Sequence, residues 1–430
     1  MQTRKAFFLV CAAAASAGSL ALIGQEAPTE APAGFTTPPL TQRPQPATLS
    51  NGLPEPTQGV FGDSFVVDQE QFERPHDPTN GLGPVFNATS CASCHQNNVT
   101  GAASQITELR VGHLDANGSF MNPTVAIDHG AAAISGRSIV NDRATCDQAQ
   151  ERVPSTETIQ AKRAVLSTLG DGFVEAVSDQ TLLAIAANQP NQSGGLIHGE
   201  AIQVPILESP GATGIGRFGW KDQQPTVLSF AADAYLNEMG VTNRLRPKDT
   251  TAVCKVTTDP EDVPDLLGLA NIDHFALFIR GTQAPPPDAA LAATPDAQAG
   301  QQIFESIGCN ICHVQTLVTV PAGTKINGGA YVVSAALGNK TFHPYGDFLL
   351  HDVGTGDGIV QAGPADTANK LRTAPLWGLR IKSRFMHDLE SLTLSDAINR
   401  HKGEASEVTR RFQGLTAEQQ QQLITFLSSL

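Results

Sequence analysis

The chain has 430 residues, of which 40% are hydrophobic and 16% are charged, and this composition is typical of globular protein with a buried core in one large domain or a few smaller ones. Its formal net charge of −14 argues against nucleic acid and anionic membrane surfaces as partners, because both would repel it. The same charge suits a small neutral substrate or a basic electron-transfer protein.

The first 24 residues predict a secretory signal peptide. Arg4 and Lys5 precede a charge-free run that ends at Gly24, which is the arrangement of a cleavable signal. The alternative is a membrane anchor, but the run is rich in Ala, Ser and Gly and is therefore only weakly hydrophobic. We expect a periplasmic or secreted mature protein with no membrane anchor. Residues 25–58, which are rich in Pro, Thr and Ala, predict a flexible leader.

Two copies of one cysteine motif follow, "CASCH" at residues 91–95 and "CNICH" at residues 309–313. C-x-x-C-H is the attachment signature of c-type haem, because its two thiols reach the two vinyl groups of one porphyrin and the adjacent His binds the iron. About 0.003 such matches are expected by chance from this composition. Zinc sites and dithiol redox pairs need neither the His nor a second copy. We therefore predict two covalent haems, attached through Cys91, Cys94, Cys309 and Cys312, with His95 and His313 as proximal ligands.

Residues 59–283 are predicted to form the N-terminal haem domain. No clear helix precedes its haem motif, and the two motifs lie 218 positions apart, which is too far for a tandem pair of minimal cytochromes. We therefore expect insertions around the first haem. A strand is possible in "ISGRSIVND" (134–142), and capping signals predict helices within residues 155–189, 225–240 and 260–282.

Cys146 and Cys254 are left over once the haem motifs and Cys11, in the predicted signal peptide, are set aside. In an exported chain such a pair predicts a structural disulfide. It would close a loop of roughly a hundred residues, and the entropic model gives such a loop about 4–5 kcal/mol of stabilisation. A pair of free buried thiols is the alternative.

Residues 284–293 predict a linker, and residues 294–430 predict the C-terminal haem domain. A helix is expected from a cap at Thr294 or Asp296 to Gly308, directly before the second haem motif. Near the end of the chain, Thr416 and Gln419 form a capping box before an apolar helix face, which should pack on the first helix. The predicted fold is mainly α, with two cytochrome-c-like haem domains, the N-terminal one expanded by insertions with minor β structure.

Several stretches together resemble the bacterial di-haem cytochrome c peroxidase superfamily, and most closely its di-haem oxidoreductase branch. They appear in the family's order and cover most of the mature chain: "NGLGPVFNATSCASCH", "GRFGWKDQQPTVLSFAADAYLNEMG", "PYGDFLLHDVG", "LRTAPLWGL" and "LSDAINRHKGEASEVTRRFQGLTAEQQQQLITFLSSL". The resemblance implies that the N-terminal haem is the reactive one, where hydrogen peroxide or dioxygen binds. It also implies that the C-terminal haem receives electrons and passes them on.

The resemblance assigns roles to four residues outside the haem motifs. Glu238 matches an acidic residue above the reactive haem, where a carboxylate can move a proton between the two peroxide oxygens; an exposed Glu at a helix end is the alternative. Trp220 matches a Trp between the haems that could relay electrons, or it is a core Trp. Arg372 is expected to hold haem propionates, and His351 to hydrogen-bond near a haem.

The sixth iron ligands are less constrained. In relatives, the C-terminal haem takes this ligand from the helix after the "APLWG" segment, which points to His401, with Met386 as the runner-up. Candidates for the reactive haem are His113, His129 or an open position. Axial identity matters because it sets the potential of a haem over a range of about 0.8 V.

Two further expectations come from the same resemblance. Relatives bind a calcium ion between the haems through segments that match Asn87 and Thr373 here, so one calcium ion is a candidate cofactor besides the two haems. Where relatives commonly read His-Asp-Gly-Arg, this chain has "HDLES" at residues 387–391. Contacts made by that Gly-Arg turn are therefore not expected to carry over.

The predicted function is an exported di-haem c-type peroxidase. It would reduce hydrogen peroxide with electrons from a small redox protein such as a cytochrome c, entering at the C-terminal haem and used at the N-terminal one. One alternative is a di-haem oxygenase or oxidase that acts on an organic or protein substrate. Another is a non-enzymatic di-haem electron carrier, in which both irons are permanently six-coordinate.

Overall fold

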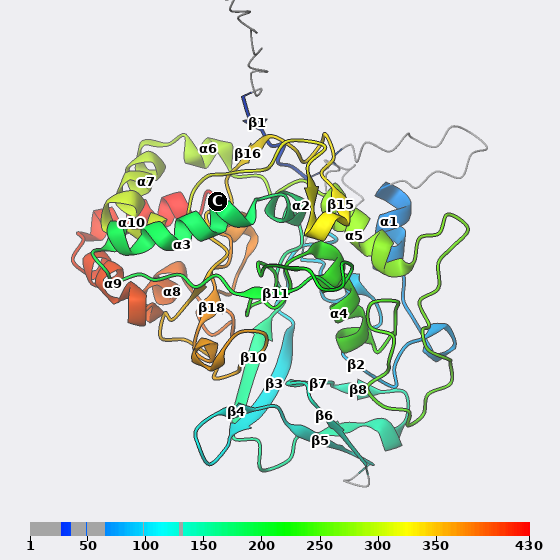
Figure 1. Ribbon diagram of the computed structural model, residues 1–430. Coiled ribbons are helices and arrows are strands. Elements are labelled where there is room, and N and C mark those ends of the chain that lie inside the picture. The colour runs from blue at the N-terminus through cyan, green and yellow to red at the C-terminus, as the bar shows by residue number, and fades with distance from the viewer. Residues whose placement is uncertain (1–26, 36–48, 50–64, 98, 129–131) are drawn as a thin grey trace, which may run out of the picture.

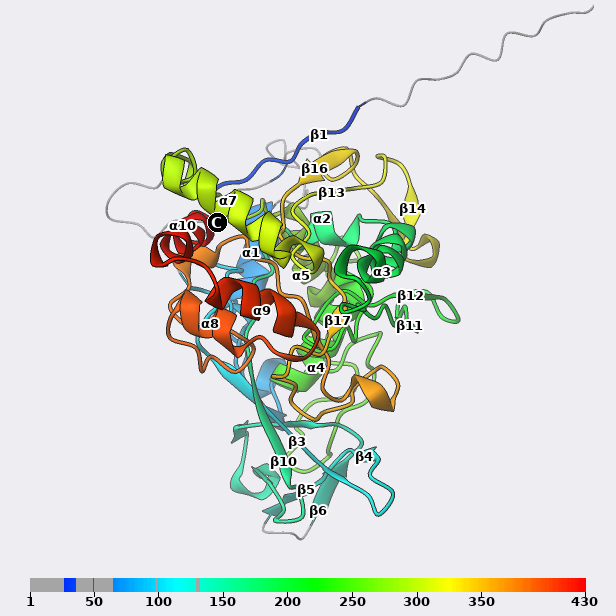
Figure 2. The ribbon, with the colours of Figure 1, turned by 90° about the vertical axis from the view of Figure 1, so that its left-hand side faces the viewer.

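The computed structural model describes residues 27–35, 49, 65–97, 99–128 and 132–430. The predicted signal peptide, most of the predicted leader and His129 lie outside these residues. Within the described part of the chain, no helix combines the length and the apolar character needed to cross a bilayer. The helices near the C-terminus gather on one side of the molecule, and a group of strands forms its lower end in both views (Figures 1 and 2).

Helices account for more residues than strands, which agrees in outline with the mainly α prediction. The helices are α1 (Phe65–Glu73), α2 (Asp171–Glu175), α3 (Asp179–Ser193), α4 (Val227–Met239), α5 (Asn271–Gly281), α6 (Ala289–Ala292), α7 (Pro295–Ile307), α8 (Leu394–Arg400), α9 (Ser406–Gln413) and α10 (Ala417–Leu427).

The strands are short except for β3 and β10. They are β1 (Thr29–Glu30), β2 (Val85–Phe86), β3 (Thr107–Leu114), β4 (Phe120–Met121), β5 (Thr124–Ile127), β6 (Ala132–Ser135), β7 (Ile139–Val140), β8 (Arg143–Ala144), β9 (Glu151–Arg152), β10 (Ile159–Ala164), β11 (Gln203–Pro205), β12 (Thr213–Ile215), β13 (Leu317–Val318), β14 (Lys325–Ile326), β15 (Tyr331–Val332), β16 (Lys340–Phe342), β17 (Leu350–His351) and β18 (Leu371–Arg372).

Helices α7 and α10 pack on each other as predicted. The hydroxyl of Thr294 caps α7, and Gly308 ends it in the left-handed conformation (φ 99°), which glycine adopts at little cost. The capping box of Thr416 and Gln419 starts α10. Gly300 lets the two helices meet closely, because a Cβ there would lie 2.0 Å from the carbonyl oxygen of Gln422.

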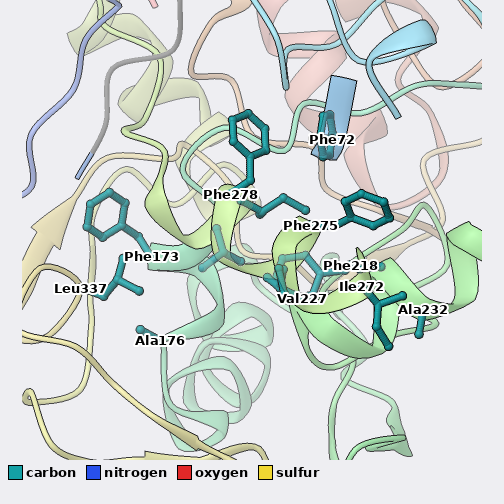
Figure 3. Packing of buried hydrophobic residues seen from close by; sticks show 14 of the residues in the cluster. Phe72, Phe173, Ala176, Phe218, Val227, Ala232, Ile272, Phe275, Phe278 and Leu337 are labelled. Carbon is teal, nitrogen blue, oxygen red and sulfur yellow. The ribbon is translucent and has the colours of Figure 1, made fainter. Parts of the chain in front are cut away.

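The central core lies where α1, α4 and α5 meet (Figure 3). The rings of Phe72 on α1 and Phe278 on α5 are 4.7 Å apart between centroids, and Phe275 packs edge-on against Phe72. Leu337 and Phe342, from the predicted C-terminal domain, belong to the same core. The two predicted haem domains therefore share one apolar interior. The predicted linker between them includes the short helix α6.

A lobe of strands projects below the helices in Figures 1 and 2 and contains β3 to β10. Its longest pair is antiparallel and runs from Ile159 opposite Gly112 to Ala164 opposite Thr107. This pair corrects the helical prediction for residues 159–164. Gln160 and Lys162 are exposed while Ala161 and Arg163 are buried, so the segment has the two-residue period of a strand although its residue types favour a helix.

Cys146 and Cys254 form a disulfide, as predicted, with their Cα atoms 6.4 Å apart. It ties the strand lobe to the long loop that follows α4, and both cysteines pack beside a small cluster of buried residues that includes Ile127 and Ile134. The bond closes a loop with a sequence separation of 108 residues.

Part of the predicted flexible leader is bound to the rest of the fold. Thr29 and Glu30 pair in parallel with Lys340 and Thr341 of β16, whose other edge pairs with β13. The buried side chain of Ala31 follows directly. The prediction was therefore wrong for this segment, because the free edge of a sheet in the C-terminal half offers it backbone hydrogen bonds that composition does not reveal.

Candidate functional site

The two haem motifs adopt the same local structure. Each begins with a turn of 3₁₀ helix, over residues 91–93 and 309–311. In each, the backbone N–H of the motif's His donates to the carbonyl of its first Cys at 3.0 Å, for His95 to Cys91 and for His313 to Cys309. The same short sequence therefore presents two thiols and one imidazole in the same way at two places.

The four motif cysteines are free thiols in the structure. Burial raises the pKa of Cys91 to about 12, that of Cys94 to about 11 and that of Cys309 to about 12, and it also raises the pKa of Cys312. Redox-active dithiols require lowered thiol pKa values. These thiols are therefore poor candidates for that alternative.

A cavity of about 530 Å³, here called the N-terminal cavity, opens over the first motif. Cys91, Cys94 and His95 line it, together with residues of α4, β3 and β10. Burial lowers the pKa of His95 to about 4, which keeps its imidazole neutral and able to bind a metal.

Glu238, at the end of α4, lies in the wall of the N-terminal cavity rather than at an exposed helix end. Asn87 donates its side-chain amide to Oε2 of Glu238 at 2.7 Å, and the carbonyl of Glu238 accepts the backbone N–H of Asn87 at 2.7 Å. Burial, with a contribution from the nearby Glu108, raises the pKa of Glu238 to about 8. The carboxyl is therefore oriented and close to its titration point at neutral pH.

Among the charged residues of the cavity wall that were not predicted are Glu108 and Arg110 on β3. The guanidinium of Arg110 binds both carboxylate oxygens of Glu108, with its Nε 2.7 Å from Oε1 and its Nη2 3.1 Å from Oε2. Burial would raise the pKa of Glu108, but the charge and hydrogen bonds of Arg110 outweigh it and hold the pKa at about 2. The sequence "TELRV" contained an indication of this pair, because its two charged residues are two positions apart and so share one face of a strand.

The structure does not bring His113 to the N-terminal cavity. It lies on β3 beyond Arg110, with its side chain 34% exposed and its Nδ1 2.8 Å from Oε2 of Glu157. The strand carries it past the cavity wall, so the prediction of a sixth ligand at this position is not supported. Among the described residues of the wall, His95 is the sole imidazole, and the thioether of Met239 is packed in the central core.

A second cavity of about 240 Å³, here called the C-terminal cavity, opens over the second motif. His313 lies in its wall and donates its Nδ1–H to the carbonyl of Tyr345 at 3.0 Å. His401 lies in the same wall and donates its Nδ1–H to the carbonyl of Ala397 at 2.7 Å. Because a carbonyl can only accept, both Nε2 atoms carry free lone pairs and are available to a metal. Met386 also lines this cavity.

His351 lies between two carboxylates beside the second motif. Its Nε2 is 2.9 Å from Oδ2 of Asp347, its Nδ1 is 2.9 Å from Oε2 of Glu404, and the same Nδ1 is 3.8 Å from Sγ of Cys312. Burial opposes a charge here, but Asp347 and the other partners raise the pKa of His351 well above its ordinary value. Both ring nitrogens of His351 therefore face carboxylate oxygens, which favours the protonated imidazolium.

Trp220 and Arg372 line both cavities. The indole N–H of Trp220 donates to the carbonyl of Ala164 at 2.8 Å, and its ring lies 6.0 Å from that of His387 between centroids. Arg372 donates its backbone N–H to the carbonyl of Trp220 at 2.9 Å, which joins the two residues directly. The shared wall places an oxidisable ring and a buried cation between the two cavities.

The sequence model of the family described as "Di-haem oxidoreductase, putative peroxidase" matches residues 140–430. The chain belongs to this family. The match begins inside the strand lobe, so Glu238, Trp220, Arg372 and the second haem motif lie within it, whereas the first haem motif precedes it.

None of the curated proteins matches this di-haem oxidoreductase. Among solved structures, the hydrazine synthase of Kuenenia stuttgartiensis is 15% identical, with 86% of this chain and 89% of that chain covered and a TM-score of 0.38. A MauG-like protein associated with microbial copper homeostasis is 18% identical over 37% of this chain and 52% of that chain, with a TM-score of 0.25.

The residues of this di-haem oxidoreductase fit the haems that its family implies. Each cavity has two thiols one turn apart and a neutral imidazole beside them. The Nε of Arg372 is buried without a hydrogen-bond partner in the described structure, and Asp222 is 4.0 Å away. A buried guanidinium N–H without a partner suits a propionate carboxylate.

The structure adds no support for a calcium site. Asn87 and Thr373 line different cavities, and the side-chain oxygen of Asn87 already accepts the backbone N–H of Asp142 at 2.9 Å. An acidic cluster elsewhere in the described residues, formed by Asp249, Asp259 and Glu261, is closed around the ammonium of Lys255.

The departure from the family at "HDLES" has a local explanation. Arg400, from the end of α8, donates its Nη1 to Asp388 and to the hydroxyl of Ser391, at 3.0 and 3.1 Å. An arginine that follows the turn in sequence therefore binds the turn in this chain. His387 itself lies in the wall of the C-terminal cavity.

Proposed function

We propose that this di-haem oxidoreductase is an exported peroxidase that carries two covalent haems. One would be attached at Cys91 and Cys94 with His95 on its iron, and the other at Cys309 and Cys312 with His313 and His401 on its iron. The main support is the contrast between the two cavities. The N-terminal one holds an oriented carboxyl and one imidazole, while the C-terminal one holds several imidazoles, among them His313 and His401 with free Nε2 atoms.

The reaction is the reduction of hydrogen peroxide by two electrons and two protons to give two molecules of water. When bound, the haem of the N-terminal cavity supplies an iron with an open position for peroxide and one of the two electrons. Glu238 moves the proton. Asn87 holds its Oε2, which leaves Oε1 to take the proton of the near peroxide oxygen and to return it to the far one.

The pKa of Glu238 suits this exchange. A group that must accept and then donate a proton works best when its pKa is near the working pH, and burial together with Glu108 raises this pKa to about 8. Arg110 binds Glu108 rather than Glu238, so it does not hold Glu238 in its charged form by direct pairing.

Electrons would enter at the C-terminal haem and cross through the shared wall. Trp220 supports this route because its ring borders both cavities, and Arg372 bonds to its backbone. The proposed donor is a small redox protein such as a cytochrome c, since a net charge of −14 favours a basic partner. The disulfide between Cys146 and Cys254 supports a periplasmic or secreted location.

Replacement of the acid–base group tests the proposal. We expect Glu238→Gln to lower peroxide turnover by roughly 10²–10⁴-fold, the usual contribution of general acid–base catalysis. Turnover is measured with a reduced cytochrome c as donor, on protein whose intact mass shows two covalent haems. Glu390→Gln is the matched control, because the side chain of Glu390 is 74% exposed and is not among the described residues that line either cavity. Equal turnover in Glu238→Gln and the control would exclude the acid–base role.

The non-enzymatic carrier predicts a different spectrum. If both irons were permanently six-coordinate, the protein would bind neither cyanide nor peroxide at either haem. The single imidazole of the N-terminal cavity favours an open position there, so we expect one of the two haems to bind cyanide. Two low-spin haems that never bind cyanide would establish the carrier instead, and a stable dioxygen complex of the reduced protein would favour an oxygenase.

A further inference from the structure

One polar pair in the wall of the N-terminal cavity has no part in the proposed reaction. Tyr235 lies on α4, one turn before Glu238, and lines the cavity although its side chain is only 2% exposed. Its hydroxyl is 2.7 Å from Nε2 of His76, which lies after α1 and is buried as well. The phenol therefore spans the distance between the cavity and a buried base.

The direction of this hydrogen bond follows from its neighbours. Nδ1 of His76 is 3.2 Å from the carbonyl of Arg74, and a carbonyl can only accept, so Nδ1 carries the proton. In a neutral imidazole, Nε2 is then the acceptor. The side-chain amide of Asn271 donates to the same Tyr235 oxygen at 3.1 Å, which occupies one of its lone pairs. Tyr235 therefore donates its O–H to Nε2 of His76.

The surroundings keep both members of the pair neutral. Burial lowers the pKa of His76, despite opposing hydrogen bonds from the backbone. Burial also raises the pKa of Tyr235 well above its ordinary value, with a further contribution from Asp262. The resting pair is thus a protonated phenol beside a neutral imidazole with a free lone pair. A phenol that loses an electron becomes a strong acid, and here a base lies in place to take its proton.

We propose that Tyr235 is a redox-active residue that gives one electron to the reactive centre after peroxide has oxidised it, while its phenolic proton passes to Nε2 of His76. The O–H bond of Tyr235 breaks and an N–H bond forms on His76. The products are a neutral tyrosyl radical, an imidazolium and a reactive centre reduced by one electron. The inference rests on the proposed function in one respect, namely that the N-terminal cavity is where an oxidant acts.

No other tyrosine or tryptophan is placed in this way among the described residues. The chain has three tyrosines and two tryptophans, and of these Tyr331, Tyr345 and Trp377 line neither cavity. Tyr331 also lies under the guanidinium of Arg280, 3.9 Å from its ring, where a positive charge opposes oxidation. The indole N–H of Trp220 donates to a backbone carbonyl, which cannot take its proton. Trp220 can therefore pass an electron only while it keeps its proton, whereas Tyr235 can hold an oxidising equivalent as a neutral radical.

The test oxidises the protein carrying both haems without any electron donor. A peroxyacid is used beside hydrogen peroxide, because its carboxylate leaves without help from Glu238, so the oxidised centre forms even if hydrogen peroxide is not a substrate. Samples frozen within milliseconds are examined by electron paramagnetic resonance, with ring-deuterated tyrosine incorporated in a parallel preparation. We expect an organic radical whose hyperfine splitting collapses with deuterated tyrosine and which forms more slowly in D₂O.

Three variants assign the signal. Tyr235→Phe should lose it, while the matched control Tyr331→Phe should keep it. His76→Gln can still accept the hydrogen bond but cannot take the proton, so it should retain the fold, shown by an unchanged circular dichroism spectrum, and form the radical in much lower yield. An unchanged signal in Tyr235→Phe, a signal insensitive to deuterated tyrosine, or no organic radical with the peroxyacid would each overturn the inference. Failure with hydrogen peroxide alone would instead count against the proposed peroxidase.

Discussion

The N-terminal and C-terminal cavities are each built on a haem motif with the same local structure, but they differ in the residues that face this motif. In the N-terminal cavity, α4 and β3 bring a carboxyl pair and an arginine opposite one imidazole. In the C-terminal cavity, α8 brings His401 opposite His313, and each imidazole is held by a backbone carbonyl. The attachment motif is local, whereas the partner that faces it comes from elsewhere in the chain.

The local motif therefore determines where a haem can be attached, whereas the residues that face the motif determine what chemistry that haem can support. A position open to peroxide needs a cavity without a second strong ligand and with a group that moves protons. An electron-transfer haem needs two fixed ligands, because fixed ligands leave little to rearrange when the iron changes its charge. In the proposed function, the wall that contains Trp220 and Arg372 would join the two haems.

After the loss expected for Glu238→Gln, the next largest effect on turnover should come from breaking this shared wall. We expect Trp220→Phe to slow peroxide turnover with a cytochrome donor by at least roughly ten-fold, equivalent to about 1.4 kcal/mol of activation free energy. A phenyl ring is harder to oxidise than an indole and lacks the N–H that Trp220 gives to Ala164. Stopped-flow spectroscopy would follow the transfer from one haem to the other directly.

The chain has one other tryptophan, which provides the control. Trp377 is buried in the central core, where its ring lies 5.9 Å from that of Phe342 between centroids. Trp377→Phe should lower stability without slowing transfer between the haems. A transfer rate in Trp220→Phe equal to that in Trp377→Phe would show that Trp220 is only a packing residue.

A ligand exchange in the C-terminal cavity should change a reduction potential and have a smaller effect on peroxide turnover. We expect His401→Met to raise the reduction potential of the C-terminal haem, on the order of 0.1 V, because a thioether ligand favours ferrous iron more than an imidazole does. The N-terminal haem should keep its potential. A redox titration followed by absorbance separates the two haems.

Met386 lines the same cavity and is the rival ligand. Met386→Leu should leave both potentials unchanged if His401 is the ligand. A rise or fall confined to Met386→Leu would instead assign the position to Met386 and remove His401 from the proposal.

The parts of this arrangement that follow from short-range sequence could be predicted. Two thiols and an imidazole within five residues need no tertiary information, and capping residues such as Thr294 and Thr416 mark the ends of α7 and α10 locally. The disulfide between Cys146 and Cys254 followed from elimination among few cysteines. The roles of Glu238 and Trp220 came from resemblance, and the structure places both residues in cavity walls.

The parts of this arrangement that depend on pairing between distant segments of the chain could not be predicted from the sequence. Glu108 and Arg110 reach the N-terminal cavity because β3 pairs with β10. Residues 159–164 form β10, but their residue types favour a helix, so the sequence does not predict this strand. His113 lies on β3 with Glu108 and Arg110. Only the pairing register of β3 shows that His113 lies beyond the cavity wall. The bond between Tyr235 and His76 likewise joins residues 159 positions apart.

The smallest effect we predict is a shift of a pH profile, and it isolates what β3 adds to the N-terminal cavity. The low pKa of Glu108, about 2, means that this carboxylate is ionised at neutral pH, and its negative charge helps burial to raise the pKa of Glu238 to about 8. In Glu108→Gln that charge is gone and Arg110 is released from it, so both changes favour the ionised form of Glu238. The ionisation of Glu238 seen in the pH profile of peroxide reduction should therefore move to lower pH, while Glu157→Gln, on a residue that pairs with His113 outside the cavity, should leave it in place. Stopped-flow rates across the pH range measure both, and a profile that stays fixed or moves to higher pH in Glu108→Gln would mean that β3 does not tune the acid–base group.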